Sequence, residues 1–421
     1  MQQSDRKEQW QRIQQQLSYT FRTSRFYQRV FQELSVQVDC ITSYEEYSKL
    51  PITTKEQLQQ YNEDFISIPP EQIIDHVTTS GTLGEPVSFY LNEYDLERLA
   101  ENESRSFELA GITRQDKVLI TTTLDRRFMA GMAYFLGLRK LGAGAIRTGG
   151  GLPGLQWESI FRFKPKYIIA VPSFLLKLIQ YAEENQIDYQ NSSIRSAICI
   201  GEPLRTSNFE LNSLGQKISS LWDIELFSTY ASTEMATAFT ECNKHQGNHV
   251  PEDLIFTEVL DQDGNHVAEG EIGELIVTPL NVQSMPLIRF ATGDMLTYTD
   301  TACKCGRKGR RLGPVIGRKQ QKIKLKGTSL YPQHIIEILN RFNGLQNFII
   351  EVSVDKNGVD RLKILIPESF REIESLKEHL KAFLNVLPEI RLEDSKTLQY
   401  LKFPANSRKP KIFYDLIKLT T

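Results

Sequence analysis

The sequence is poor in the features that mark secreted, membrane-spanning and nucleic-acid-binding proteins. Its five cysteines among 421 residues are too few for a disulfide framework. No apolar run approaches the ~20 residues that a membrane-spanning helix needs. The polar N-terminus, MQQSDRKEQWQRIQQQ, lacks the apolar segment of a signal peptide. The formal net charge of -2 favours neither nucleic acid nor an anionic membrane surface. We therefore expect a cytoplasmic protein without nucleic-acid or membrane partners.

The composition is that of a globular protein with a large buried core. Hydrophobic residues make up 40% of the chain and charged residues 24%. Short β-branched runs alternate with amphipathic segments up to about residue 230, a pattern typical of a parallel or mixed sheet covered by helices on both faces. The expected strands lie in 117–123, 142–148, 167–171 and 196–201, and the expected helices in 5–34, 93–110, 131–141 and 173–185.

The character of the sequence changes twice after residue 250. Residues 253–300, with a turn at 261–264, indicate antiparallel sheet. A break at Gly317-Arg318 precedes a smaller unit with a strand, helices at 332–342 and 370–385, and an Asn-Gly hairpin turn at 356–358. The fold class predicted is α/β, with a large N-terminal body of mixed sheets covered by helices (1–317) and a small α+β C-terminal domain (318–421).

The cysteines separate into two groups. Cys40 and Cys199 stand alone among apolar residues and are expected to be buried core thiols. Cys242 and the Cys303-x-Cys305 pair lie near His245 and His249, which suggests a metal ion rather than a crosslink. Three thiolates and one imidazole form a set that tetrahedral zinc accepts, and four protein ligands would make the site structural. Reduced thiols without a metal are the alternative.

One glycine-rich segment could hold phosphate groups. Residues 78–86, TTSGTLGEP, follow an apolar segment and precede the strand-like VSFYL. Glycines and small hydroxyl residues allow a loop to wrap closely around phosphates. The segment lacks the G-K-[ST] ending of the P-loop of nucleotide hydrolases. Taken alone, it could be a simple turn between strands.

Further motifs follow this loop in a fixed order. They are Tyr230-Ala231-Ser232-Thr233-Glu234, Arg289-Phe290-Ala291-Thr292-Gly293-Asp294, Gly317-Arg318 and Lys409. The ordered set resembles the superfamily of acyl-CoA synthetases, nonribosomal-peptide adenylation domains and luciferases. Within it, the chain is most similar to the phenylacetate–CoA ligases through Phe26-Tyr27, Leu50-Pro51 with Thr53-Thr54-Lys55, Gly201-Glu202-Pro203-Leu204 and Cys303-Lys304-Cys305-Gly306. The resemblance covers nearly the whole chain.

The resemblance implies an AMP-forming carboxylic acid–CoA ligase that uses ATP, Mg²⁺ and CoA. It assigns the ATP phosphates to Thr79, Ser80, Gly81, Thr82 and Gly84, and the adenine pocket to Gly201, Glu202, Pro203 and Tyr230 with the following Ala231, Ser232 and Thr233. Glu234 would bind Mg²⁺, Asp294 the ribose hydroxyls, and Arg318 a ribose or phosphate group at the hinge. Lys409, on a mobile C-terminal domain, would bridge carboxylate and phosphate. Lys411 competes with it for that role.

The resemblance also implies an acyl pocket and a preferred class of acid. Relatives build the pocket from the segment 127–135, so Gly131, Tyr134, Phe135 and Ala231 are its candidates here, although Met and aromatic stripes are more often core. The family prefers aryl and arylacetic acids. No cationic residue clearly awaits a second carboxylate, which favours a monocarboxylic acid. His249 matches the histidine of zinc-bearing relatives and opens the segment HVPEDL, so it is preferred to His245.

Five positions depart from the family pattern. Glu85 replaces a lysine after the loop glycine, Ala231 replaces a glycine, Gln320-Gln321 replace aspartates at the hinge, and Arg408 replaces the glycine before the catalytic lysine. These departures leave two alternative functions open: an adenylate-forming ligase with a carrier-protein or amine acceptor, and a nucleotide-binding protein that no longer turns over. The oligomeric state, including a homodimer, is also left open.

Overall fold

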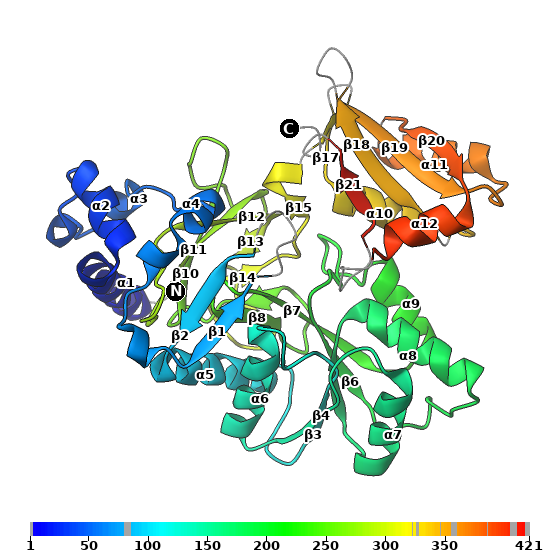
Figure 1. The fold of residues 1–421 in the computed structure, drawn as a ribbon, viewed down its shortest axis with the longest axis horizontal. Coiled ribbons are helices and arrows are strands. Elements are labelled where there is room, and N and C mark those ends of the chain that lie inside the picture. Colours follow the sequence, from blue (N-terminus) through cyan, green and yellow to red (C-terminus); the bar gives the residue numbers. More distant parts are fainter. Residues whose placement is uncertain are drawn as a thin grey trace. The chain divides into compact units, whose positions relative to one another are not determined.

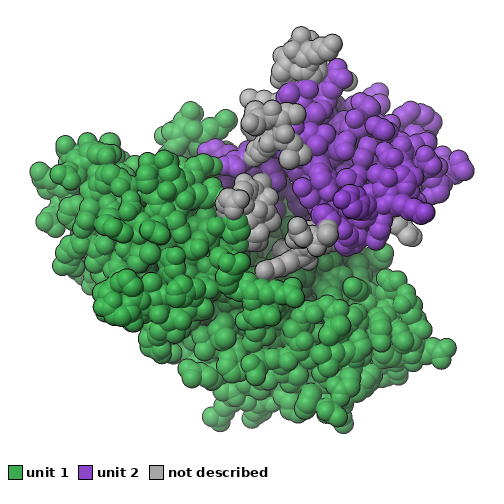
Figure 2. All heavy atoms as spheres, viewed as in Figure 1, with its two compact units in different colours: residues 1–292, 296–314 green, residues 293–295, 315–421 purple. Residues whose placement is uncertain are grey.

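The computed structural model describes most of the chain. The described residues are 3–79, 86–321, 323–325, 328–345, 347–354, 360–384, 386–404 and 411–416. Several predicted features lie outside them: the phosphate-loop residues 80–85, the hairpin tip 356–358, and residues 408–410 with Lys409. The chain divides into two compact units, residues 1–292 with 296–314 and residues 293–295 with 315–421 (Figure 2). The predicted boundary at 317/318 falls inside the second unit.

The larger unit is built on a nine-stranded sheet (Figure 1). Its strands are β3 (Lys117–Ile120), β4 (Gly144–Arg147), β5 (Tyr167–Ala170), β6 (Ser196–Cys199), β7 (Glu225–Ser232), β8 (Thr237–Glu241), β9 (Asn248–His249), β13 (Tyr298–Thr299) and β14 (Arg311–Leu312). Their order in space is β13-β14-β9-β8-β7-β6-β5-β3-β4. The strands from β7 to β4 are parallel, and those from β8 to β13 are antiparallel. The prediction of a mixed sheet is confirmed.

Helices cover both faces of this sheet because its buried strands are apolar on both sides. The helices are α5 (Glu93–Leu109), α6 (Met129–Leu141), α7 (Pro153–Phe163), α8 (Pro172–Glu184) and α9 (Ser213–Leu221). Successive residues of a strand point to opposite faces. Val118 therefore packs with Phe107 of α5 and Leu138 of α6, whereas Leu119 packs with Trp157 of α7 and Leu178 of α8.

A second sheet and the N-terminal helices complete the larger unit. The sheet has the order β10 (Ile255–Leu260), β11 (Gly273–Pro279), β12 (Phe290–Leu296) and β15 (Gly317–Arg318). Gly293–Met295 of β12 and the whole of β15 belong to the smaller unit, whereas Leu296 belongs to the larger one. A separate hairpin joins β1 (Asp75–Thr78) to β2 (Ser88–Leu91). The N-terminal elements are α1 (Gln3–Thr23), α2 (Arg25–Glu33), η1 (Val38–Cys40), α3 (Tyr44–Ser48), α4 (Lys55–Gln60), η2 (Asn62–Phe65) and η3 (Pro70–Gln72). Phe26, Tyr27 and Phe290 share one buried cluster.

The smaller unit is an α+β domain with a core of its own. It contains η4 (Lys319–Gln321), β16 (Ile323–Leu325), β17 (Thr328–Leu330), α10 (Pro332–Asn340), β18 (Ile349–Val354), β19 (Asp360–Pro367), α11 (Ile373–Leu384), β20 (Glu389–Glu393), α12 (Ser395–Lys402) and β21 (Phe413–Asp415). β20, β19, β18 and β21 form one sheet in that order. Ile335, Ile364 and Leu380 are buried together beneath it.

Some local expectations were wrong. The helix expected over 5–34 is two helices, because Ser24 takes an extended conformation between α1 and α2. Helices α7, α9 and α12 were not predicted from the sequence. Cys199 is buried as expected, but Cys40 is exposed at the end of η1, where its thiol contacts Gln37. Among the described residues, no helix is long and apolar enough to span a membrane.

One buried carboxyl group lies between α5 and α6. The Glu103 side chain is only 5% exposed, and a Cβ atom on Gly137 of α6 would lie 2.4 Å from the Cβ atom of Glu103. This close approach of the two helices removes water from the carboxyl group. Burial raises the pKa of Glu103 to about 8, because desolvation disfavours its charged form.

The pKa of Glu103 predicts how stability depends on pH. In the unfolded chain the Glu103 carboxyl group has a pKa near 4.5, whereas in the folded protein its pKa is about 8. Between these two values the unfolded chain releases the proton more readily, so the free energy of unfolding falls as the pH rises from about 4.5 to about 8. The loss should amount to roughly 3–5 kcal/mol across that window. Thermal unfolding between pH 5 and 9 should show this decline, and Glu103→Gln should flatten it. An equally steep decline in Glu103→Gln would contradict the assignment.

Candidate functional site

The predicted phosphate loop lies in the sequence between the paired strands β1 and β2. The backbone N–H of Thr79 donates to the Val87 carbonyl (2.9 Å), and the Val87 N–H donates to Thr79 Oγ1 (3.0 Å). The N–H of Thr78 donates to the carbonyl of Arg127 (3.0 Å), a residue with a positive φ of 58°. The residues at the base of the loop are thus fixed. Ser80, Gly81, Thr82 and Gly84 lie outside the described residues.

The segment from Tyr230 to Glu234 forms the end of β7 and the turn that follows it. Tyr230 is half-buried, and its ring stacks on Phe239 with centroids 5.8 Å apart. The Glu234 side chain is 9% exposed, and its Oε1 lies 3.5 Å from the Nζ of Lys55. A buried carboxylate without a counter-charge would be costly. Lys55, the first residue of α4, supplies that charge.

Helix α5 holds the far side of this turn. Arg98 is buried and donates to the carbonyls of Ala236, Leu254 and Leu280. One helical turn later, the Asn102 side chain donates to the Ala238 carbonyl and accepts from the Ala238 N–H. Residues four apart share one face of a helix, so the two side chains follow strand β8. Burial lowers the pKa of Arg98 to about 10. The turn that carries Glu234 is therefore held from both ends.

The segment Gly201–Pro203 follows β6 at the carboxyl edge of the parallel strands. Gly201 has a φ of +72°, a conformation that a residue with a side chain rarely adopts. The Glu202 carboxylate accepts hydrogen bonds from the backbone N–H (2.9 Å) and the hydroxyl (2.8 Å) of Ser173, so it caps the first turn of α8. The Pro203 carbonyl accepts from Asn212 (2.8 Å). The Glu202 side chain therefore fixes the segment against the first turn of α8.

The acyl-pocket candidates differ in their surroundings. A Cβ atom on Gly131 would lie 2.0 Å from the Thr123 carbonyl oxygen, so the glycine permits close packing of α6. Tyr134 is buried and belongs to the core between α5 and the sheet. Phe135 is half-buried, and the guanidinium group of Arg147 lies 5.1 Å from its ring centroid. Ala231 is exposed on β7.

The smaller unit contains the remaining nucleotide candidates. Asp294 of β12 lies opposite Arg318 of β15, and its Oδ1 is 3.3 Å from the Arg318 Nε. A Cβ atom on Gly317 would meet the Tyr331 ring at 2.6 Å, so the residue before Arg318 must be small. Lys409 lies outside the described residues. The ammonium group of Lys411 lies over the Tyr414 ring, 4.2 Å from its centroid.

The four predicted metal ligands meet at one point of the larger unit. The ligand atoms of Cys242, His249, Cys303 and Cys305 all lie within 4.8 Å of one another. The Cys242–Cys303 Sγ atoms are 3.7 Å apart, as are Cys305 Sγ and His249 Nε2. Tetrahedral zinc with bonds of ~2.3 Å would place its ligand atoms about 3.7 Å apart, so the donor set fits this ion.

The ionisation of the cluster agrees with this fit. Burial, with the nearby charges of Arg311 and Arg307, lowers the pKa of His249 to about 4, so the imidazole is neutral at pH 7. Neutral imidazole is the form that binds a metal ion. A cavity of about 350 Å³ is lined in part by Cys242 and Cys305.

His245 is engaged elsewhere. Its Nδ1 lies 3.1 Å from Glu241 and its Nε2 lies 3.1 Å from Glu225. The Glu241 carboxylate is fully buried and also binds Arg205 through two hydrogen bonds of 2.6 and 2.7 Å. His245 therefore belongs to a carboxylate network beside the cluster, and the preference for His249 agrees with the geometry.

Two residues close to the site were not assigned a role from the sequence. Lys55 belongs to a motif that resembles the family, but the motif assigned it no role, although it pairs with Glu234. Arg98 lies on an amphipathic helix, where a charged residue usually faces solvent. The periodicity of α5 could have identified Arg98, because it lies on the same face as the buried Asn102 and Ser106. No signal local to residue 55 indicates its partner.

The sequence matches a family model described as AMP-binding enzyme over residues 24–284, and the chain belongs to this family. The match spans the phosphate-loop hairpin, the Gly201–Pro203 segment and the turn with Glu234. The chain is a phenylacetate–CoA ligase-like member of the adenylate-forming superfamily, as predicted. The predicted class of enzyme, an ATP-dependent AMP-forming ligase, is confirmed.

Curated relatives come from several bacteria. The phenylacetate-coenzyme A ligase of Thermus thermophilus is 28% identical over 336 residues, which cover 78% of this chain and 74% of that protein. The enzyme of the same name from Escherichia coli is 27% identical and covers 85% and 81%. The protein CapK of Staphylococcus aureus is 21% identical, with coverage of 85% and 77%.

Solved structures agree on the fold. The 2-hydroxyisobutyryl-CoA ligase, in complex with an adenylate, superposes with a TM-score of 0.84 over 99% of this chain and 90% of that one, at 23% identity. An anthranilate CoA ligase superposes with a TM-score of 0.59 at 17% identity and covers 82% and 67%. The predicted fold class is confirmed.

The cluster predicts a structural zinc ion bound by this chain. Purified without chelators, the protein should contain about one zinc per chain, and Cys303→Ser should lose it and unfold at a lower temperature. Elemental analysis and thermal unfolding measure both effects. Cys40→Ser, which removes an exposed thiol outside the cluster, is the control and should retain zinc. Metal-free wild-type protein with an unchanged unfolding temperature in Cys303→Ser would reject the site.

Proposed function

We propose that this chain activates a carboxylic acid with ATP as its acyl-adenylate and transfers the acyl group to CoA. The single observation that carries the proposal is the buried Glu234 carboxylate, which lies at the carboxyl edge of the sheet with Lys55 3.5 Å away. One carboxylate together with substrate phosphates is the ligand arrangement that Mg²⁺ prefers. The phenylacetate–CoA ligase relatives support CoA as the acceptor.

In the first step the substrate carboxylate oxygen attacks the α-phosphorus of ATP. The new O–P bond forms as the bond between the α- and β-phosphates breaks, and pyrophosphate leaves with the electron pair. Glu234 would hold Mg²⁺, which offsets the charge that develops on the phosphates. Thr79 and the loop above it would bind the phosphates, and Tyr230 and Gly201–Pro203 would line the adenine.

In the second step the CoA thiolate attacks the acyl carbon and AMP leaves. The adenylation and thiol-transfer steps need different groups at one site. We therefore infer that the C-terminal residues 318–421 form a mobile domain that turns at Arg318 between them. Asp294, ion-paired with Arg318, would accept hydrogen bonds from the ribose hydroxyls.

Lys55 offers a reason why Glu85 is tolerated after the phosphate loop. The family lysine at position 85 is absent, so the triphosphate needs a cation from elsewhere. The Lys55 ammonium group already lies beside Glu234 and would turn to the phosphates when Mg²⁺ occupies the carboxylate. Because Lys55 belongs to a motif shared with the phenylacetate–CoA ligases, it would be a cation that the site retains in spite of Glu85.

The acid is proposed to be an aryl or arylacetic monocarboxylic acid. Phenylacetate in the names of the relatives supports this choice. Phe135 and the exposed Ala231 are the pocket candidates that are not sealed in the core. The structural zinc, the cytoplasmic location, and the absence of nucleic-acid and membrane partners stay predictions, and the homodimer stays open.

An assay of products separates the proposal from its two alternatives. The protein is incubated with MgATP and a panel of aryl, arylacetic and short aliphatic acids, with and without CoA. An acid–CoA ligase releases pyrophosphate and AMP and forms a CoA thioester with at least one acid. AMP formation without a thioester would favour a carrier-protein or amine acceptor. Absence of pyrophosphate with every acid would favour the non-catalytic nucleotide-binding protein.

Lys409 and Lys411 can be distinguished by their effects on the half-reactions. Lys409→Ala should slow adenylation by ~10²–10³, the usual loss for one preorganised contact to developing charge. It should leave thioester formation from the supplied acyl-adenylate nearly unchanged. Lys411→Ala should be mild in both assays, since its ammonium group contacts Tyr414. A large defect in Lys411→Ala instead would shift the assignment by two residues.

Lys55→Ala should weaken adenylation by about 10- to 100-fold, the loss expected for a contact to a charged group. The effect should appear in the KM for MgATP, measured by pyrophosphate release with the active acid. Lys49→Ala is a matched control, because Lys49 is an exposed lysine paired with Glu45 on α3. Equal kinetics in Lys55→Ala and Lys49→Ala would refute the role of Lys55.

A further inference from the structure

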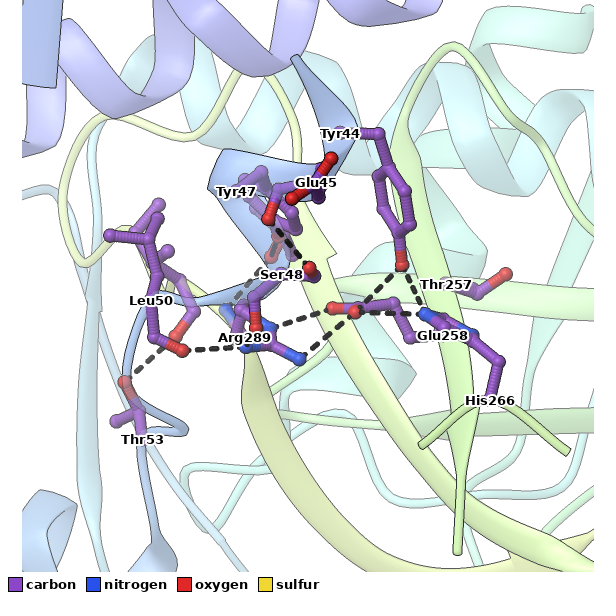
Figure 3. Close-up of polar contacts among 12 residues, drawn as sticks. Tyr44, Glu45, Tyr47, Ser48, Leu50, Thr53, Thr257, Glu258, His266 and Arg289 are labelled. Atoms are coloured by element: carbon purple, nitrogen blue, oxygen red, sulfur yellow. Dashed lines mark hydrogen bonds and ion pairs between the residues drawn. The ribbon is translucent and has the colours of Figure 1, made fainter. Parts of the chain in front are cut away.

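A buried ion pair far from Glu234 in sequence fixes the segment that carries Lys55. Arg289 is 3% exposed and Glu258 is 1% exposed. The Arg289 guanidinium donates to both carboxylate oxygens of Glu258, with Nε–Oε2 3.0 Å and Nη2–Oε1 3.1 Å (Figure 3). The Tyr44 hydroxyl also donates to Glu258 Oε1 (3.0 Å), and the His266 ring lies 3.6 Å from it.

The same guanidinium group binds the N-terminal segment. Its Nη1 donates to the carbonyl of Ser48 and to the carbonyl of Leu50 (2.5 Å) (Figure 3). These two residues lie at the end of α3 and at the start of the segment that connects α3 to α4. A planar group with five donors in fixed directions can bind a carboxylate on one side and carbonyls on the other. A lysine cannot make this set of bonds at once.

The backbone of Arg289 also binds Thr53. We call Glu258, Arg289 and the residues of the segment 48–53 that Arg289 binds the clamp. The Thr53 N–H donates to the Arg289 carbonyl (3.0 Å), and the Ala291 N–H donates to the Thr53 carbonyl (2.9 Å). The Thr53 hydroxyl donates to the carbonyl of Ile288 (2.7 Å) and contacts the Tyr27 hydroxyl (2.8 Å). Arg289 itself has a φ of 46°, so its backbone is held in an uncommon conformation.

The clamp ends directly before the functional lysine. Thr54 caps α4 through a capping box with Gln57, and Lys55 is the first residue of that helix. Leu50, Thr53 and Thr54 are each held by hydrogen bonds. Every residue from Leu50 to Lys55 is therefore one of these three residues or a direct neighbour of one. The Lys55 ammonium group, at the end of this fixed segment, lies 3.5 Å from Glu234 Oε1.

We propose that Arg289, held by Glu258, is a positioning residue that places Lys55 against Glu234 and the nucleotide phosphates. The proposal rests on the proposed function for the role of Lys55. Arg289 touches neither Lys55 nor Glu234 and acts through the backbone of residues 48–53. Its effect on nucleotide binding should therefore depend on the presence of Lys55.

A double-mutant cycle on the full chain tests this dependence. The dissociation constant of MgATP is measured calorimetrically for wild type, Arg289→Lys, Lys55→Ala and the double variant. MgATP is anionic, so loss of Lys55 or of its placement should each weaken binding by about 10- to 100-fold. The double variant should be no weaker than Lys55→Ala alone. Glu258→Gln and the milder Tyr44→Phe repeat the test if Arg289→Lys does not fold.

Hydrogen exchange supplies a second readout that does not depend on the nucleotide. Peptides covering residues 44–58 should exchange faster in Arg289→Lys than in wild type. Arg205→Lys is the matched control, since Arg205 forms a buried bidentate pair with Glu241 and holds no part of that segment. Arg205→Lys should destabilise the fold without faster hydrogen exchange in residues 44–58. Any change that it causes in the dissociation constant of MgATP should be the same in the presence and in the absence of the Lys55 side chain.

The outcomes separate the clamp from the proposed function. The positioning role of Arg289 would be overturned if the increases in the MgATP dissociation constant caused by Arg289→Lys and Lys55→Ala multiply in the double variant. It would also be overturned if hydrogen exchange in residues 44–58 is the same in Arg289→Lys as in wild type. If Lys55→Ala binds MgATP as wild type does, the role of Lys55 in the proposed function fails, and the positioning role fails with it. The wild-type protein could bind MgATP, with the effects of Arg289→Lys and Lys55→Ala non-additive as expected, and yet adenylate no acid. That result would refute the proposed reaction and leave the positioning role of Arg289 supported.

Discussion

The buried pair of Arg289 and Glu258 is the constraint on which the N-terminal body depends most. It joins strand β10 to the start of β12 and ties the segment after α3 to both. Removal of one partner from a buried ion pair leaves an uncompensated charge, at a cost of roughly 3–5 kcal/mol. That is a large share of the stability of a globular protein. Packing alone could join these elements, but it would not fix their register so closely.

The candidate site is built on the same principle of polar ties to rigid elements. Arg98 and Asn102 attach helix α5 to the turn that carries Glu234, and Glu202 attaches the Gly201 segment to α8. Each tie uses backbone carbonyls or N–H groups, so it fixes the main chain on which the site is built. This arrangement suits electrostatic catalysis, in which groups must be placed before charge develops.

The sequence predicted the elements whose signal is local. The apolar runs of β3, β5 and β6 identify buried parallel strands, and the motif that ends in Glu234 identifies its turn because all its residues are contiguous. Cys242, His249, Cys303 and Cys305 could be grouped because cysteine and histidine are rare in this chain. Their convergence is then required by the pairing of β14 with β9.

The remaining features depend on contacts between distant parts of the chain. The pairing of Lys55 with Glu234 has no signal near either residue, because it follows from the Arg289 clamp. Cys40 has apolar neighbours, yet its thiol points outward, since η1 is a short helix that buries only Val38. The smaller unit carries Asp294 because β12 continues into it, a division that periodicity cannot reveal.

The central claim is that the chain forms an acyl-adenylate before any thiol takes part. The most direct test is exchange of labelled pyrophosphate into ATP in the presence of Mg²⁺ and an acid, without CoA. Reversible adenylation predicts acid-dependent exchange in the wild type and its loss in Glu234→Gln. Exchange that requires CoA, or that persists unchanged in Glu234→Gln, would contradict this account.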